Sequence, residues 1–350
     1  MSRNIPFRYD FVGSFLRPEK LKEARAAFGR GEIDKAQLTR VENECITQLI
    51  AKQKEAGYHV ITDGEFRRAT WHLDFMWAFD GVGHSKTQTG LPFHGEQAMI
   101  DDTYLTGKVS VSGVHPFVEH FKFVKQFEDE NTVAKQTIPA QFLEQMILPF
   151  AAENTAKYYS DNEELVNDIA AGYRKVIADL YEAGCRNLQL DDCSWGMLVD
   201  PMAKLFFDTD DEGLLKVQEL FVRINNLAIE GVPCDMTVAT HVCRGNFHST
   251  YASSGAYNDV AKVLFEQENV DAYYLEFDDE RSGGFGPLSH VNGDKKVVLG
   301  LITTKKPELE DKQAVTARIH EAAKYIPLDR LCLSPQCGFA SCEIGNKLTK

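Results

Sequence analysis

A histidine and a cysteine stand two residues apart at the end of an apolar run, where they could bind one metal ion. The run DMTVATHV (235–242) is predicted to be a β-strand. His241 is the penultimate residue of this run, and Cys243 is the first residue after the run. Residues i and i+2 of a strand point to the same face, so both side chains can reach one ion. Imidazole and thiolate are both good zinc ligands. By itself the pair is a weak signal, because a hydrogen-bonded histidine beside a buried cysteine gives the same pattern and is the commoner case.

Two further ligand candidates follow other predicted strands. Glu276 ends the run AYYLE, and Cys337 follows the run LCLS in the sequence Pro-Gln-Cys-Gly. An acid inside a fold is rarely left without a partner. Glu276 therefore either binds an ion or pairs with Arg281 or Lys305.

Together the candidates supply one nitrogen, one oxygen and two sulfur donors, a set that suits tetrahedral zinc. A structural zinc site usually has closely spaced cysteine pairs, whereas these residues lie on three separate strand ends. This scattering favours a catalytic ion. Cys193 and Cys342 are further thiols that could substitute. The predicted ligands are His241, Cys243, Glu276 and Cys337.

Short apolar, β-branched runs alternate with helix-length segments along the chain. The predicted strands are 9–15, 59–63, 134–139, 187–191, 235–242, 272–276, 297–303 and 331–334. The predicted helices between them include 37–56, 163–183, 211–229, 256–268 and 310–325. This alternation predicts a parallel sheet with crossover helices. We interpret it as an α/β fold of the TIM type, a (β/α)8 barrel, with an open doubly wound sheet as the alternative.

A ninth candidate strand, 108–112, is one too many for such a barrel. It lies in a stretch of glycines and polar residues, and we interpret it as part of a hairpin inserted after the second strand. We expect residues 1–350 to form a single barrel with an insertion at about 79–130. In parallel barrels the catalytic groups come from the carboxyl ends of the strands, where the candidate ligands lie.

The composition narrows the class of function. The formal net charge is −14 and the isoelectric point is about 5.2, which disfavours binding to nucleic acid and to anionic membranes. No run approaches the length of a transmembrane helix, and the N-terminus has no signal-peptide core. The eight cysteines have irregular spacing, so we expect reduced thiols rather than a disulfide framework. These features predict a cytoplasmic protein that acts on small molecules.

Several segments, in this order, resemble the catalytic barrel of cobalamin-independent methionine synthase. Three of them are similar to its zinc motifs: HVCRGNF (241–247), YYLEFDDERSG (273–283) and LSPQCGFAS (333–341). Three more are similar to its homocysteine-binding segments: VGSFLRP (12–18), ITDGEFRR (61–68) and LQLDD (188–192). The likeness recurs over about residues 10–341.

The resemblance implies a TIM-type barrel that uses zinc to activate the thiol of homocysteine and methylates it to methionine. It assigns the zinc ion to His241, Cys243, Glu276 and Cys337. It implies a donor such as 5-methyltetrahydrofolate, its polyglutamate, or another methyl carrier, including a methyl-carrier protein. The implied homocysteine contacts are Val12, Gly13, Ser14, Glu65 and Asp191. For Glu65 and Asp191 the alternative is a salt-bridge layer with Arg67 and Arg68.

The methyl-donor side departs from the family pattern. Thr304 and Lys305 stand where the family has a proton-donating histidine, and His290 is the nearest histidine upstream. Lys305 and His290 are therefore candidates for this role, and neither is assigned. The family's tryptophan beside the folate has no counterpart in residues 136–145, although Trp71 or Trp195 could offer a stacking surface.

Two other functions stay open at this point. The first is a related zinc thiol-alkyltransferase that acts on a different thiol, as the coenzyme M transferases do. A sulfonate thiol would require a cation, for which Arg17, Arg67 and Arg68 are available. The second is a zinc- or thiol-binding protein without catalytic activity.

Overall fold

The computed structural model describes residues 4–141, 146 and 149–348. Six parallel strands form its central sheet, and each lies beside its neighbours in the sequence. They are β7 (Gln136–Pro139), β8 (Asn187–Asp192), β9 (Thr237–Val242), β10 (Ala272–Glu276), β11 (Lys296–Ile302) and β12 (Leu331–Pro335). Almost every residue of these strands is buried, as expected where both faces of a parallel sheet are covered.

Two shorter segments close the sheet into a barrel. The strand β1 (Val60–Ile61) pairs in parallel with β6 (Val133–Ala134), which leads directly into β7. On the other side, Tyr9 forms a parallel bridge to Leu333 of β12. The ring is completed where the N–H of Phe15 donates to the carbonyl of Gly64 at 3.1 Å. The predicted (β/α)8 barrel is thus confirmed: its eight strand positions follow one another around the ring.

The first predicted strand, 9–15, is reduced to that single bridge. The Asp10 carboxylate accepts the backbone N–H of Phe11 at 2.7 Å, so a side chain replaces a strand neighbour at this point. Further along, the Thr62 hydroxyl donates to the carbonyl of Gly13 at 3.0 Å. Side-chain hydrogen bonds therefore hold the segment where a regular ladder is absent.

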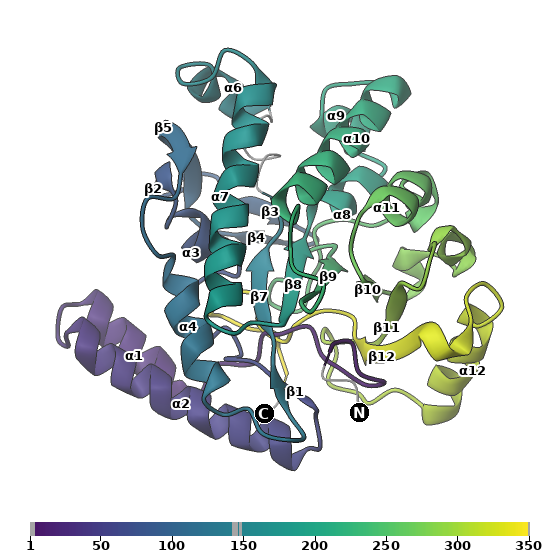
Figure 1. The fold of residues 1–350 in the computed structure, drawn as a ribbon, viewed down its shortest axis with the longest axis horizontal. Coiled ribbons are helices and arrows are strands. Elements are labelled where there is room, and N and C mark those ends of the chain that lie inside the picture. Colours follow the sequence, from purple (N-terminus) through teal and green to yellow (C-terminus); the bar gives the residue numbers. More distant parts are fainter. Residues whose placement is uncertain (1–3, 142–145, 147–148, 349–350) are drawn as a thin grey trace.

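Helices surround the barrel, as Figure 1 shows for α7, α10, α11 and α12. The longer helices are α1 (Glu19–Gly29), α2 (Lys35–Glu55), α4 (Pro116–Lys125), α7 (Asn162–Glu182), α10 (Asp211–Ala228) and α12 (Lys312–Ala322). The shorter ones are α3 (Leu73–Met76), α6 (Pro149–Thr155), α8 (Ser194–Val199), α9 (Ala203–Phe206) and α11 (Ala261–Gln267). Asp161, Asp210 and Asp311 cap α7, α10 and α12 by accepting a backbone N–H of the first turn, which fixes where these helices begin.

The segment after α3 forms two antiparallel pairs outside the barrel. The strand β2 (Asp80–Ser85) pairs with β5 (Asp102–Ser110), and between them β3 (Leu91–Phe93) pairs with β4 (Glu96–Ala98). The prediction that the ninth candidate strand belongs to an inserted hairpin is confirmed. The inner pair reaches the loop after β9, where Glu96 contacts His248 at 2.8 Å.

The barrel interior contains a buried charged network in addition to apolar side chains. The Lys135 ammonium lies 3.3 Å from Asp10 and 3.0 Å from the side-chain oxygen of Gln189, and Tyr274 donates to Asp10 at 2.8 Å. Each charge therefore has a partner, as burial requires. Among the described helices, none is long and apolar enough to cross a bilayer.

Candidate metal centre and substrate pocket

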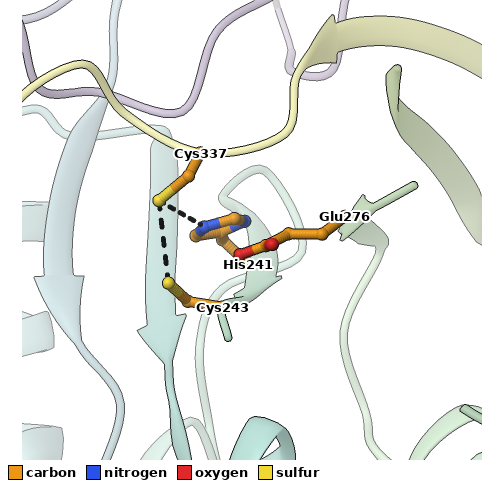
Figure 2. A group of neighbouring side chains, drawn as sticks. All are labelled: His241, Cys243, Glu276 and Cys337. Atoms are coloured by element: carbon orange, nitrogen blue, oxygen red, sulfur yellow. Dashed lines mark hydrogen bonds between the residues drawn. The ribbon is translucent and has the colours of Figure 1, made fainter. Parts of the chain in front are cut away.

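The four predicted ligands meet at the carboxyl ends of β9, β10 and β12. His241 lies near the end of β9, Cys243 directly after it, Glu276 at the end of β10, and Cys337 in the loop after β12. All four are buried, and one ligand atom from each lies within 4.8 Å of the others. Figure 2 shows the two thiols facing each other, with the imidazole and the carboxylate beside them. The structure thus brings together residues that are far apart in sequence.

The distances suit a shared ion. Sγ of Cys337 lies 3.4 Å from Nε2 of His241 and 3.6 Å from Sγ of Cys243. Zinc–sulfur and zinc–nitrogen bonds of about 2.3 and 2.0 Å place tetrahedral ligand atoms at about this separation. Without a cation the arrangement disfavours thiolates, because the hydrogen bond with Cys243, together with burial, raises the pKa of Cys337 well above its usual value.

A hydrogen bond to the backbone fixes the orientation of the His241 ring. Its Nδ1 lies 3.2 Å from the carbonyl oxygen of Tyr274, a geometry in which the N–H at Nδ1 donates. Nε2 is then unprotonated and free to bind a metal. The N–H of Gly245 donates to Sγ of Cys243 at 3.2 Å, a contact that stabilises a thiolate.

Cations surround Glu276. Its Oε1 accepts the N–H of Arg244 at 2.8 Å, while its Oε2 lies 3.3 Å from Arg281 and 4.0 Å from Lys305. Burial opposes ionisation of this carboxyl, but Lys305, Arg281 and Arg244 together hold its pKa below the usual value. Both sequence interpretations of Glu276 therefore describe the same residue: it is a metal-ligand candidate that also forms ion pairs. Its anionic form, the form that binds metal, is the stable one.

The two substitute thiols lie outside this cluster. Cys193 follows β8, and a hydrogen bond with it is the leading reason that the pKa of Cys243 is raised. Cys342 instead lies near Arg17 and Glu65. Neither contributes to the group of four whose ligand atoms converge. The donor chemistry and the geometry fit one zinc ion held by His241, Cys243, Glu276 and Cys337.

Two buried carboxylates stand beside the metal cluster. Asp191, near the end of β8, is the register partner of His241 in β9, and Glu65 interacts electrostatically with Asp191. Burial raises the pKa of Glu65 to about 7 and that of Asp191 to about 6. Two acids that hinder each other's ionisation form a favourable site for a cation.

The salt-bridge layer considered as the alternative role of Glu65 and Asp191 is present only in part. Arg68 lies 3.4 Å from Oε1 of Glu65, whereas Arg67 pairs with Glu42 at 3.0 Å. Oε2 of Glu65 has no hydrogen-bond partner among the described residues. Asp191 accepts the side-chain amide of Gln189 at 2.7 Å. The carboxylate pair thus retains an unused acceptor.

The segment 12–14 lies against the loop that carries Cys337. The hydroxyl of Ser14 accepts a hydrogen bond from the N–H of Ala340 at 3.2 Å. The backbone carbonyl of Ser14 accepts one from the N–H of Phe339 at 3.0 Å. A Cβ on Gly13 would lie 2.8 Å from Cγ2 of Thr137, so only glycine fits there. The side chain of Val12 belongs to an apolar cluster, so only its backbone is available for polar contacts.

A pocket opens at the carboxyl ends of β7 and β8, and Asp191 and Cys193 form part of its wall. Trp71, His72 and Met76 line another part. Trp195, the other candidate for a stacking surface, is fully buried in the core. No sequence pattern described above indicated His72. Its place in a pocket follows from the fold.

The two candidates for a proton donor have different surroundings. The Nζ atom of Lys305 is buried, lies 4.0 Å from Glu276 and has no hydrogen-bond partner among the described residues. His290 is on the surface, where its Nδ1 lies 2.6 Å from Glu266. Lys305 therefore lies beside the metal cluster, whereas His290 is engaged in a surface ion pair.

Known proteins resemble this chain over most of its length. The family model described as cobalamin-independent synthase, catalytic domain, matches residues 9–91 and 140–349. The unmatched stretch between these ranges contains most of the inserted hairpins and α4. An uncharacterised protein of Bacillus subtilis, YxjG, is 42% identical over 350 residues, which cover 99% of this chain and 90% of the relative. A methionine synthase of Saccharolobus solfataricus is 23% identical over 340 residues, covering 93% and 86%.

Solved structures give the same result. A Listeria monocytogenes protein, provisionally named a vitamin-B12-independent methionine synthase, is 40% identical with a TM-score of 0.76 and covers 97% of this chain and 93% of its own. A B12-independent methionine synthase from a Shewanella species, solved with selenomethionine, shares the fold at 20% identity and a TM-score of 0.69, over 95% and 91% of the two chains. The protein belongs to the family of cobalamin-independent methionine synthase catalytic domains.

Proposed function

We propose that the protein is a zinc-dependent S-methyltransferase that converts homocysteine to methionine. One observation carries the proposal: a converging His, Cys, Glu, Cys set lies next to a pair of buried carboxylates at one end of the barrel. The first group suits a thiol-activating metal, and the second suits the ammonium of an amino acid. A thiol that also carries an ammonium group matches both.

Zinc, when bound by these four residues, would supply the positive charge that converts a thiol with a pKa near 8.5 into a thiolate at neutral pH. The protein's own residues do the rest. Arg244 and Arg281 keep Glu276 ionised, and the Tyr274 carbonyl keeps Nε2 of His241 available. Because Glu276 also has cationic partners, it is the ligand best able to yield its position to the substrate sulfur.

The amino-acid end of homocysteine has matching groups. Glu65 and Asp191 would bind its ammonium and would become fully ionised in doing so, because the added cation offsets their mutual repulsion. The backbone N–H groups of Gly13 and Ser14 donate to no other group among the described residues and would receive its carboxylate. These contacts hold the sulfur near the metal cluster.

Transfer then requires a methyl donor, for which we propose 5-methyltetrahydrofolate, its polyglutamate, or another methyl carrier such as a methyl-carrier protein. The sulfur lone pair forms the new bond to carbon, and the carrier leaves with the electron pair of the broken bond. A sulfonate thiol is disfavoured because Glu65 and Asp191 would repel it. The candidate arginines Arg17, Arg67 and Arg68 are already engaged with backbone carbonyls and protein side chains.

The test is the metal content of the purified protein, followed by zinc-edge X-ray absorption with and without homocysteine. We expect one zinc per chain and a gain of one sulfur ligand when homocysteine is added. A zinc shell that does not respond to homocysteine would contradict thiol activation, and absence of zinc after purification without chelator would refute the metal assignment. Binding without turnover, with every donor tested, would identify a non-catalytic protein.

A further inference from the structure

Asp191 is held in place by Gln189, which precedes it on the same face of β8. Residues i and i+2 of a strand point to the same face, and both of these side chains are buried. The side-chain amide of Gln189 donates to Oδ1 of Asp191 at 2.7 Å. No other hydrogen bond reaches the carboxylate of Asp191 from the described residues. Gln189 is therefore the side chain that orients Asp191.

Lys135 determines which way round the amide of Gln189 lies. Nζ of Lys135 lies 3.0 Å from Oε1 of Gln189, and an ammonium group can only donate. The amide oxygen must therefore face Lys135, which leaves the amide NH2 group for Asp191. The other acceptors around Nζ are the Asp10 carboxylate, at 3.3 Å, and the carbonyl of Phe11. All three N–H donors of the ammonium thus have an acceptor.

The rest of this buried network is fixed as well. Asp10 accepts the hydroxyl of Tyr274 at 2.8 Å and the N–H of Phe11 at 2.7 Å. Nζ of Lys135 also lies 4.7 Å from the centroid of the Tyr274 ring, a cation–π contact. A buried polar network whose members all have partners is rigid, because a rotation would leave a group unpaired. The orientation of the Gln189 amide is therefore set by the barrel interior and not by a ligand.

The two acids of the proposed ammonium site are held in the same manner. Oε1 of Glu65 accepts the hydroxyl of Thr137 at 3.2 Å and lies 3.4 Å from Arg68. Oε2 of Glu65 has no hydrogen-bond partner among the described residues. In Asp191, Gln189 occupies Oδ1 and leaves the second oxygen. Each carboxylate thus uses one oxygen for the protein and keeps the other for a group that donates.

We propose that Gln189 is a positioning residue that holds Asp191 in the orientation in which it accepts a hydrogen bond from an ammonium group. Gln189 thereby makes the site selective for thiols that carry an ammonium, and Lys135 takes part by fixing the amide. A ligand group that only accepts, such as a sulfonate, would meet acceptors in this part of the site. This inference rests on the proposed function, which assigns the homocysteine ammonium to Glu65 and Asp191.

The experiment is a double-mutant cycle between Gln189 and Asp191, with the Kd of L-methionine measured by calorimetry on the zinc-loaded protein. Gln189→Met removes the donor to Asp191 and keeps the length of the side chain. We expect this change to raise the Kd about tenfold in the wild-type background, because a hydrogen bond to a charged group is lost. In the Asp191→Ala background the same change should raise the Kd by less than about twofold, because Gln189 acts through that carboxylate.

Two further measurements separate positioning from a general effect on the fold. The analogue of L-methionine that lacks its amino group should bind the wild type and Gln189→Met equally well. Zinc content should be the same in all variants, because neither residue is among the converging ligands. Gln218→Met is the matched control, since Gln218 is a buried glutamine of α10 outside this network, and its Kd should equal that of the wild type.

If Gln189→Met does not fold, Gln189→Asn takes its place in the cycle. The shorter amide still offers Lys135 an oxygen, but it cannot reach Asp191 as well. An unchanged Kd in the folded variant would overturn the inference, and so would an equal rise of Kd in both backgrounds, which would indicate a general structural role. A wild type that binds neither L-methionine nor homocysteine would refute the proposed function together with this inference. Binding of both that is insensitive to position 189 would refute the inference alone.

Discussion

The carboxylates Glu65 and Asp191 combine two properties that a stable fold would avoid: both are buried, and they repel each other. Such a pair is costly to ionise in the empty protein, and a bound ammonium relieves that cost. The same residues that weaken the empty fold thus favour the proposed substrate. This gives a residue-level test of the substrate assignment that is independent of the metal.

We expect Asp191→Asn to raise the KM for homocysteine at least tenfold, since the loss of a charged hydrogen bond costs about 1.5–3 kcal/mol. Its zinc content should stay at the wild-type level, because Asp191 is not among the converging ligands. Steady-state kinetics and metal analysis on the same preparation check both statements. An unchanged KM would remove Asp191 from the substrate site.

The pH dependence of amino-acid binding follows from Glu65. Its carboxyl has a pKa of about 7 when buried and must be ionised to bind an ammonium, so affinity should fall as the pH drops below 7. L-Methionine is the suitable probe because its sulfur carries no proton. We expect its Kd, measured by calorimetry, to rise by up to about tenfold per pH unit. Glu65→Gln should bind weakly, and its Kd should change little between pH 7 and pH 6, below which Asp191 still titrates. A wild-type-like rise of Kd between pH 7 and pH 6 in that variant would contradict the assignment.

Through Glu65, a rise in pH lowers the free energy of unfolding, whereas a salt-bridged acid with a lowered pKa has the opposite effect. The folded-state pKa of Glu65 lies above its ordinary value of 4.5, so the folded protein holds the proton more tightly than the unfolded chain. The contribution of Glu65 to stability is therefore present at low pH and is lost as the pH rises from about 4.5 to about 7. Above this window, Glu65→Gln should unfold at a higher temperature than the wild type.

For the metal ligands, Cys337→Ser and Cys243→Ser should each lose most of the zinc and all methyl transfer while the barrel still folds. A hydroxyl is a much poorer zinc ligand than a thiolate. Metal analysis and circular dichroism provide the two readouts. Cys332→Ser, in β12 but outside the cluster, is the matched control. Full zinc occupancy in both ligand variants would mean that the ion lies elsewhere.

At the scale of elements, the site depends on how the loop after β12 lies against segment 12–15. A Cβ on Gly338 would lie 1.9 Å from Oγ of Ser14, so glycine is what permits this close approach. The carbonyl of Gly338 also accepts a hydrogen bond from Asn246 at 2.6 Å, which ties the loop to the one after β9. The loop thereby holds Cys337 in place against two other loops.

Gly338→Ala should therefore move Cys337 without unfolding the barrel. We expect zinc affinity to fall at least tenfold, measured by competition with a chromophoric chelator. Gly284→Ala is the matched control, because a Cβ there meets nothing within 4 Å. Equal zinc affinity in the two variants would show that the loop adjusts freely and that its position is not what holds the ligand.

At the scale of the whole molecule, the proposed ligands lie at the ends of three strands, β9, β10 and β12. Because these strand ends are brought together only in the folded barrel, metal binding and stability of the fold are coupled. A ligand that binds only the folded state stabilises it by about 2.7 kcal/mol at a free concentration 100 times its Kd. Removal of zinc by a chelator should lower the midpoint of thermal unfolding in the wild type. In Cys337→Ser the midpoint should not respond to chelator. A wild-type midpoint that ignores chelator would argue against a resident zinc ion.

The sequence by itself predicted the architecture, and with the family resemblance it also gave the proposed ligand set, whose side chains converge in the structure. Each barrel strand appears in the sequence as a short apolar run that ends in polar residues. This pattern can be recognised without knowing the neighbouring strands, because every strand buried on both faces needs apolar residues. His241 and Cys243 could be paired by strand periodicity, and Glu276 and Cys337 by their places at strand ends. The inserted hairpin was predicted for the same reason, since strand 108–112 had no place in an eight-stranded ring.

Only the tertiary structure decided which side chains share an environment. The first barrel strand is only a single bridge at Tyr9. There the Asp10 side chain accepts the backbone N–H of Phe11, a contact that sequence periodicity does not reveal. That Arg68 rather than Arg67 pairs with Glu65, and that Nδ1 of His72 has no hydrogen-bond partner among the described residues, depends on how the barrel surrounds these side chains. Burial, electrostatic coupling and the absence of a partner are properties of the surroundings, and the surroundings exist only once the barrel has closed.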